Sequence, residues 1–289
     1  MKPFILSTDS GCDLPAELCR EKEIAVLPME YEINSERFYE TSRPEGLAEF
    51  YRKMEEGAVV HTSSVNVADY LRFFEPLLTQ GLPIIHIALG SGISSTYQNA
   101  LLAKQELELT HPDAQLFIVD SLGASLVYGM QVLHAAGLRD NGVSAEAAFE
   151  ELSEYRHHIS PYYTTGNLEY LYRGGRVSRG GLFIARTLNI WPILNLNAAG
   201  ELKVIDRAKG SRRAYAQICS HIRNFVIKPE EQTLYICHSN VPDKAQEFAE
   251  FLQAELGFRD IFYTQISATI GAHTGPGLVA AFFYGKERV

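Results

Sequence analysis

Two hydroxyl residues, Thr62 and Ser94, stand just past short apolar segments of the chain. Residues 83–89, before Ser94, read PIIHIAL, an apolar run with β-branched residues that is typical of a buried strand. A GSGISST stretch follows, and the sequence from Tyr97 onward predicts a helix. Hydroxyl groups and the N–H groups at a helix start hold anions well. The pair therefore predicts an anion site, with ordinary helix capping as the structural alternative.

Ser94 also fits a catalytic interpretation. Residues 92–96 read GISST, which matches half of the strand-to-helix elbow G-x-S-x-G that carries a serine nucleophile. Thr96 stands where the second glycine of that elbow belongs. His273 would then act as the base, with an acidic residue elsewhere in the chain. A serine hydrolase of acyl substrates is therefore the alternative function.

A third interpretation of the same stretch is dinucleotide binding. Residues 90–95 read GSGISS, in which Ser95 replaces the last glycine of a G-x-G-x-x-G loop. The acidic residue that would bind the ribose, Asp120, lies further along the chain than is usual. The chain also has no G-x-x-x-x-G-K-[ST] phosphate loop. Nucleotide binding is accordingly weakly supported.

Basic residues form small islands in this acidic chain. Arg173 and Arg176 lie in YRGGRVS, and Arg207 lies in DRAKGSRR. Such islands can hold a phosphate or the acidic face of a partner, and ion pairs within the protein are the structural alternative. His273 lies in GAHTGPG, whose glycines and proline predict a specified loop rather than a helix. Its imidazole is expected either to bind an anion or to make a structural contact.

The bulk composition excludes several function classes. The net charge of −9 over 289 residues argues against nucleic-acid binding. No run of about 18 apolar residues predicts a membrane span, and no signal peptide is recognisable. The four cysteines form no C-x-x-C pair and the histidines no H-E-x-x-H motif, so we expect neither a metal nor a cofactor. A cytoplasmic protein without stable membrane insertion is expected.

Strand, loop and helix patterns alternate through the first half of the chain. This order predicts an α/β fold with a largely parallel sheet, whose ligands lie beyond the carboxyl ends of the strands. Asp13 is expected to cap an early helix. The character of the sequence changes near Ser160, where tyrosines and glycines become frequent. We expect two α/β domains, residues 1–158 and 159–289, with the ligand at their interface.

A set of short motifs, spread over essentially the whole chain, resembles the DegV family of bacterial fatty-acid-binding proteins. The motifs are TDSGCDLP at 8–15, HTSSVN at 61–66, SGISSTYQNA at 91–100, IVDS at 118–121, NLEYLYRGGRVS at 167–178, WPIL at 191–194 and GAHTGPG at 271–277. Each motif alone is modest, but their order and spacing together are specific.

The resemblance implies a non-catalytic carrier that binds one long-chain fatty acid, such as palmitate, stearate or oleate. The N-terminal domain would hold the carboxylate on Thr62 and Ser94, and the C-terminal domain would cover the acyl tail in an apolar tunnel. Ser95 and His273 would lie beside the headgroup.

The resemblance also implies a possible partner. Some relatives present the bound acid to a separate ATP-dependent fatty acid kinase subunit, which forms an acyl phosphate for phospholipid synthesis. Arg173, Arg176 and Arg207 would then serve phosphotransfer or contact with that partner.

Two positions depart from the family pattern. The usual T-S-Q-P-S reads TSSVN at residues 62–66, and the usual S-G-T-Y reads SSTY at residues 94–97. A side chain at Ser95, where the family has glycine, would either crowd the carboxylate or donate a further hydrogen bond to it.

Overall fold

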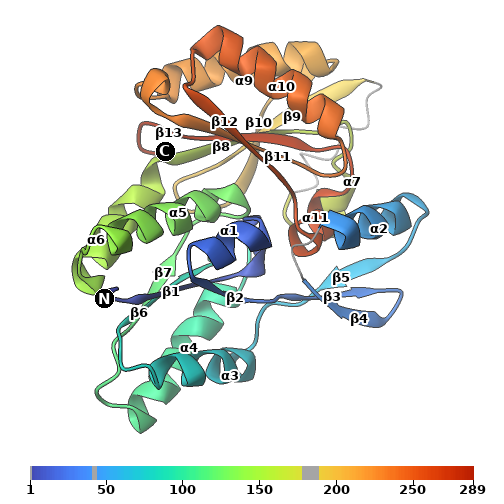
Figure 1. Ribbon diagram of the computed structural model, residues 1–289. Helices are drawn as coiled ribbons and strands as arrows, with labels where there is room; N and C mark the ends of the chain where they lie inside the picture. The colour runs from blue at the N-terminus through green and yellow to red at the C-terminus, as the bar shows by residue number, and fades with distance from the viewer. Residues whose placement is uncertain (1, 41–43, 178–188) are drawn as a thin grey trace.

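The computed structural model describes residues 2–40, 44–177 and 189–289. These residues form two α/β domains, each built around one sheet, with a small three-stranded sheet at the side of the molecule (Figure 1). The mixed α/β architecture expected from the sequence is confirmed. No helix in the described ranges is long and apolar enough to cross a membrane.

The strands are β1 (Ile5–Asp9), β2 (Ile24–Leu27), β3 (Glu30–Ile33), β4 (Glu36–Tyr39), β5 (Val60–Thr62), β6 (Ile84–Ala88), β7 (Leu116–Asp120), β8 (Ile159–Thr164), β9 (Ile190–Leu196), β10 (Leu202–Lys209), β11 (Thr233–His238), β12 (Asp260–Gln265) and β13 (Val279–Tyr284). The α-helices are α1 (Ala16–Glu21), α2 (Pro44–Glu55), α3 (Val67–Leu78), α4 (Thr96–Thr110), α5 (Leu126–Asp140), α6 (Ala145–Tyr155), α7 (Glu169–Arg173), α9 (Ser211–Phe225), α10 (Pro242–Leu256) and α11 (Ala268–Thr274). Short 3-10 turns lie at η1 (Ser10–Cys12), η2 (Arg156–His158) and η3 (Pro229–Glu231).

The N-terminal sheet is wholly parallel, in the order β2-β1-β6-β7. All five residues of β6 are buried, as expected for an interior strand with helices on both faces of the sheet. In Figure 1, α5 and α6 lie on one face of this sheet and α3 and α4 on the other. The strand predicted within residues 83–89, and the helix predicted after it, are both confirmed.

Aspartates at two strand ends hold the loop between β6 and α4. A carboxylate oxygen of Asp9, at the end of β1, accepts a hydrogen bond of 3.0 Å from the N–H of Leu89. Asp120, at the end of β7, accepts from the N–H of Ser91 at 3.0 Å and from its hydroxyl at 2.6 Å. Burial raises the pKa of Asp9 to about 6. The two carboxylates thus fix the loop that carries Ser94.

The C-terminal sheet has the order β10-β9-β8-β13-β11-β12. Its pairs are antiparallel except β11 with β12. Helices α9 and α10 cover one face, and the other face is turned toward the N-terminal domain (Figure 1). Strands β9 and β10 form an antiparallel pair on either side of the turn at Ala199 and Gly200.

Asp13 does not cap a helix of its own domain, so that prediction is wrong. Helix α1 begins at Ala16 and has no side-chain cap. Asp13 instead adopts a left-handed conformation, with a φ of 57°, and turns toward the other domain. Its carboxylate accepts from the N–H of Ser267 at 2.9 Å, and its backbone carbonyl accepts from the hydroxyl of Thr264 at 2.8 Å. Asp13 therefore joins the domains directly before α11.

Candidate functional site

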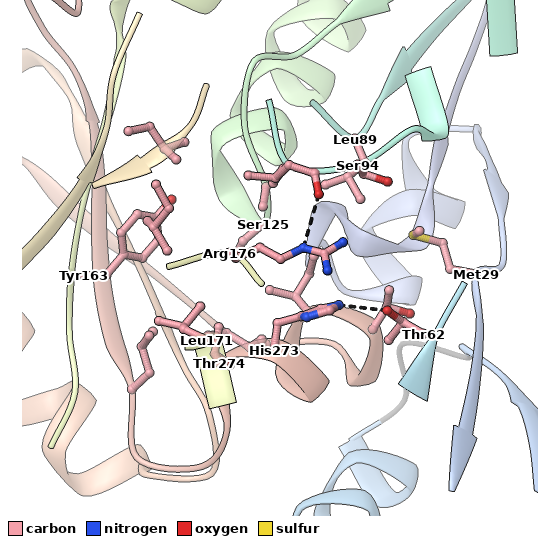
Figure 2. A pocket seen from close by; sticks show the side chains of 18 of the residues that line it. Met29, Thr62, Leu89, Ser94, Ser125, Tyr163, Leu171, Arg176, His273 and Thr274 are labelled. Atoms are coloured by element: carbon pink, nitrogen blue, oxygen red, sulfur yellow. Dashed lines mark hydrogen bonds between the residues drawn. The ribbon is translucent and has the colours of Figure 1, made fainter. Parts of the chain in front are cut away.

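A cavity of about 440 Å³ lies between the two domains, lined by residues from both. Hydroxyl side chains, an imidazole and a guanidinium gather at one end (Figure 2). Much of the remaining wall is aliphatic. That wall includes Leu171, Leu194, Leu196, Leu202, Ile266 and Leu278. The cavity therefore offers a polar end and a long apolar surface to one ligand.

Thr62 and His273 meet at the polar end, from different domains. Thr62 ends β5, and β3 holds this strand end through the pairing of Tyr31 with Thr62. The hydroxyl of Thr62 lies 2.8 Å from Nε2 of His273, which is carried by α11 (Figure 2). The pair forms a bridge across the domain interface at the polar end of the cavity.

His273 lies in the last turn of α11, so the prediction of a loop at this position is wrong. The glycine within this helix, Gly271, leaves room for the hydroxyl of Tyr51, which a Cβ would overlap. The helix ends at Thr274, and Gly275 follows with a φ of 66°. The glycines therefore serve close packing and helix termination, and they do not prevent the helix itself.

Arg176 lies beside His273 and is the only lysine or arginine among the described residues that line the cavity. Its Nε donates to the carbonyl of Ile93 at 3.2 Å, and its guanidinium also bonds the carbonyl of Gly174. Burial lowers the pKa of Arg176. Burial, and then the charge of Arg176, lower the pKa of His273 to about 4. The site at neutral pH thus combines one fixed cation with a neutral imidazole.

Ser94 and Ser95 have different surroundings. The hydroxyl of Ser94 accepts from the N–H of Thr96 at 3.2 Å and lies 2.9 Å from the hydroxyl of Thr96. The hydroxyl of Ser95 is exposed and donates to the hydroxyl of Ser64 at 2.9 Å. Both Ser94 and Ser95 line the cavity. Ser95 thus links two loops at the rim, the one after β5 and the one after β6.

The remaining predicted residues lie elsewhere. Arg173 is exposed and forms an ion pair of 2.6 Å with Glu169, one turn earlier on α7. Arg207 is exposed on β10. Neither is among the described residues that line the cavity. Their role in phosphotransfer or partner contact stays a prediction, whereas Thr62, Ser94, Ser95, His273 and Arg176 share one cavity.

The geometry does not form a catalytic dyad on Ser94. Nε2 of His273 is engaged by Thr62, and the hydroxyl of Ser94 is engaged by Thr96. A serine nucleophile needs a base within hydrogen-bond reach. Within the described residues, no group of three or more His, Cys, Asp or Glu side chains could hold a metal ion.

Comparison with known proteins shows which family the chain belongs to. The family model for DegV matches residues 4–286. The chain belongs to the DegV family. A DegV domain-containing protein of Clostridium perfringens is 34% identical over 289 residues, which cover 100% of this chain and 99% of the relative. The family assignment made from the sequence motifs is confirmed.

Solved DegV structures share the fold over the full chain. A DegV family protein from Thermus thermophilus, described as fatty acid binding, is 28% identical with a TM-score of 0.88, covering 99% of this chain and 100% of that one. A DegV family protein from Eubacterium eligens, loaded with heptadecanoic acid, is 19% identical with a TM-score of 0.86, covering 98% and 100%. The second likeness shows the common fold alone.

Sequence reasoning does not single out two further residues of the cavity wall, Ser125 and Tyr163. Adjacent tyrosines at 162 and 163 in a strand signal that one of them faces the opposite domain, because side chains alternate along a strand. The pattern does not say which one. Ser125 has a φ of 58°, and no local sequence signal predicts that conformation for a serine.

Proposed function

We propose that this protein binds one long-chain fatty acid in the cavity between its domains. The carboxylate lies against Thr62, Ser94 and His273, with Ser95 at the rim and Arg176 beside the imidazole. The acyl tail lies along the aliphatic wall. The observation that carries this proposal is the cavity itself, which joins a polar end to a largely leucine-lined surface.

The binding energetics of a fatty acid fit a cavity that has one polar end and an apolar wall. Burying each methylene of the tail contributes roughly 0.8 kcal/mol, so the apolar wall supplies most of the affinity. A buried carboxylate must be paired or hydrogen-bonded, because an isolated buried charge is very costly. Hydroxyl donors together with Arg176 meet that need, and fatty acid binding by the related Thermus thermophilus protein supports the assignment.

The imidazole of His273 acts as a hydrogen-bonding group in this account. Its lowered pKa, about 4, keeps it neutral in the empty protein. A neutral imidazole has one donor and one acceptor nitrogen, and Thr62 engages Nε2. The tautomer then decides whether Thr62 donates to His273 or presents its own lone pairs to it.

We further propose that the protein is a carrier and not itself an enzyme. It would present the carboxylate to a separate fatty acid kinase subunit, which supplies nucleotide and metal for acyl phosphate formation. The absence of a Ser94–His273 contact supports the carrier over the serine hydrolase. The cytoplasm is the compartment we propose for this activity.

The binding proposal is tested by titrating purified, delipidated protein with stearic acid, its methyl ester and acetate. Tight binding of stearic acid alone is expected, because the site needs both the carboxylate and the tail. Equal binding of the methyl ester would show that the polar end does not recognise a carboxylate. Failure of stearic acid to bind would overturn the proposed function. The kinase step is tested separately by trapping acyl phosphate with hydroxylamine after incubating loaded protein with ATP and a cell extract.

A further inference from the structure

Besides the residues proposed to hold the carboxylate, the cavity wall carries the hydroxyl groups of Tyr163 and Ser125. Tyr163 lies on β8, and Figure 2 shows it across the cavity from Thr62, with Arg176 and His273 between them in the view. Ser125 also lines the cavity, directly before α5. The carboxylate site proposed for Thr62, Ser94 and His273 uses neither hydroxyl.

Strand register brings the two hydroxyl groups toward each other. Tyr163 pairs with Ala280, and Ala280 pairs with Cys237, so the three side chains form one row across the same face of the sheet. The middle member of this row has only a methyl group. Ser125 reaches the end of the row, because its hydroxyl lies 3.5 Å from Sγ of Cys237. Tyr163 and Ser125 therefore lie at the two ends of one row, and both line the cavity.

The hydroxyl of Tyr163 makes no hydrogen bond to any residue that the structure describes. Its side chain retains only 9% exposure, and its ring packs edge-on against Phe282 at 5.6 Å. Burial raises the pKa of Tyr163 well above its usual value, so the phenol keeps its proton. A buried phenolic donor thus faces the cavity without an acceptor.

Ser125, the second residue of this pair, has a strained backbone conformation. Its backbone has a φ of 58° and a ψ of −139°, a combination that is strained for any residue except glycine. Its hydroxyl lies 3.5 Å from Sγ of Cys237 and also interacts with the carboxyl of Asp13, whose oxygens can only accept a hydrogen bond when ionised. The chain thus keeps a serine in a costly conformation on the cavity wall, and a hydroxyl that donates to Asp13 still has a lone pair to accept a hydrogen bond.

We propose that Tyr163 and Ser125 form a second polar subsite, which binds a hydroxyl group on the acyl chain. The preferred ligand class is a hydroxylated long-chain fatty acid. The ligand hydroxyl accepts from Tyr163 and donates to Ser125. A plain hydrocarbon tail covers the hydroxyl of Tyr163 without giving it a hydrogen-bond partner, which disfavours binding of that tail. This inference rests on the proposed fatty acid function and specifies the ligand.

The test compares stearic acid with a series of stearic acids that carry one hydroxyl at successive positions along the chain. Affinities are measured by displacement of a fluorescent fatty acid from the full chain. At least one positional isomer is expected to bind about tenfold more tightly than stearic acid. Tyr163→Phe should abolish that preference while retaining or improving the affinity for stearic acid.

A matched control is available at the neighbouring position. Tyr162 points to the other face of the sheet, into the core beneath α9, so Tyr162→Phe should leave the preference unchanged. Ser125→Ala is the second variant, and it should weaken the preference in the same direction. Thermal melting curves of each variant show whether it is folded before its affinities are compared.

The outcomes separate this inference from the proposed function. Loss of the preference in Tyr163→Phe, but not in Tyr162→Phe, supports the subsite. Binding of stearic acid with no favoured isomer overturns the subsite and leaves the fatty acid function intact. A preference that survives in both Tyr163→Phe and Ser125→Ala overturns it equally. If no acid of the series binds, the fatty acid function itself fails.

Discussion

Gly174 packs directly against the imidazole of His273. A Cβ atom built at Gly174 would overlap Nδ1 of the ring, and it would also come within 3.3 Å of Cγ. The same glycine accepts a hydrogen bond from the guanidinium of Arg176 through its carbonyl. The RGGRV motif therefore holds the imidazole toward Thr62 by steric contact from behind and places the cation next to it.

Gly174→Ala is expected to displace His273 from Thr62. The added methyl has no room unless the ring moves, so the affinity for a fatty acid should fall about tenfold or more while the protein remains folded. Calorimetric titration with stearic acid measures the affinity. Gly137→Ala is the control, because a Cβ at this position of α5 meets nothing within 4 Å. Unchanged affinity in Gly174→Ala would show that the ring position does not matter.

Local signals were sufficient for much of the N-terminal domain. The buried run at 83–89 predicts β6, and the hydroxyl residues after it predict the start of α4 at Thr96, although the side chain of Ser95 at the N-cap makes no capping hydrogen bond. The polar end of the cavity could be predicted in part from the sequence, because the parallel strands of one sheet end at the same edge. Ser94 follows from that rule, because it lies beyond the carboxyl end of β6 in the parallel sheet. The prediction that Thr62 lies on the same sheet edge is wrong, because β5 pairs antiparallel with β3 in the separate three-stranded sheet.

Tertiary contacts explain what local patterns did not predict. Neither Gly90 nor Gly92 has a positive φ, so a left-handed conformation is not what requires glycine at these positions. A Cβ at Gly90 would overlap the backbone of Gly123, and one at Gly92 would overlap the carbonyl of Ala199 in the other domain. Such close approaches come from chain segments far apart in sequence. The helical setting of His273 and the interdomain role of Asp13 have the same kind of origin.

Thr62→Val should weaken fatty acid binding. The substitution keeps the shape of the side chain but removes the hydroxyl that meets Nε2 of His273, and one such bond is worth about 1 kcal/mol or somewhat more. A fall in affinity of about five- to thirtyfold is expected. Thr79→Val is the matched control, since Thr79 is exposed and does not line the cavity. Equal effects of the two substitutions would argue that Thr62 is an ordinary loop residue.

The rim bond between Ser95 and Ser64 should show as energetic coupling. It joins the loops that carry Thr62 and Ser94, and the amide of Asn99 links the same region by donating to the carbonyl of Val65 at 2.7 Å. Because the hydroxyl pair is exposed, its coupling energy should stay below about 1 kcal/mol. Stopped-flow release of a fluorescent fatty acid should be a few-fold faster in Ser95→Ala and in Ser64→Ala, with the double variant no faster than either. Additive effects would show that the two hydroxyls act independently.

The buried carboxyl of Asp13 should make stability depend on pH. Burial raises its pKa from 3.8 to about 7 in the folded protein. Between these two values the folded chain holds a proton that the unfolded chain has lost, so stability falls as the pH rises through this window. The full slope for one such group is about 1.4 kcal/mol per pH unit.

Asp13→Asn removes this titration and keeps the acceptor for the N–H of Ser267. The free energy of unfolding of the wild type, relative to this variant, should decrease as the pH rises from about 4 to 7 and then level off. Urea unfolding curves at several pH values measure the difference. A difference that does not change with pH would show that Asp13 titrates normally.

Lipid extraction from the purified protein tests the central claim most directly. Mass spectrometry of the organic extract, quantified against the protein, should find close to one long-chain fatty acid per chain, and Thr62→Val protein should retain less of it after the same washing. The claim is contradicted if the wild-type protein carries no fatty acid and also fails to take up stearic acid when it is supplied.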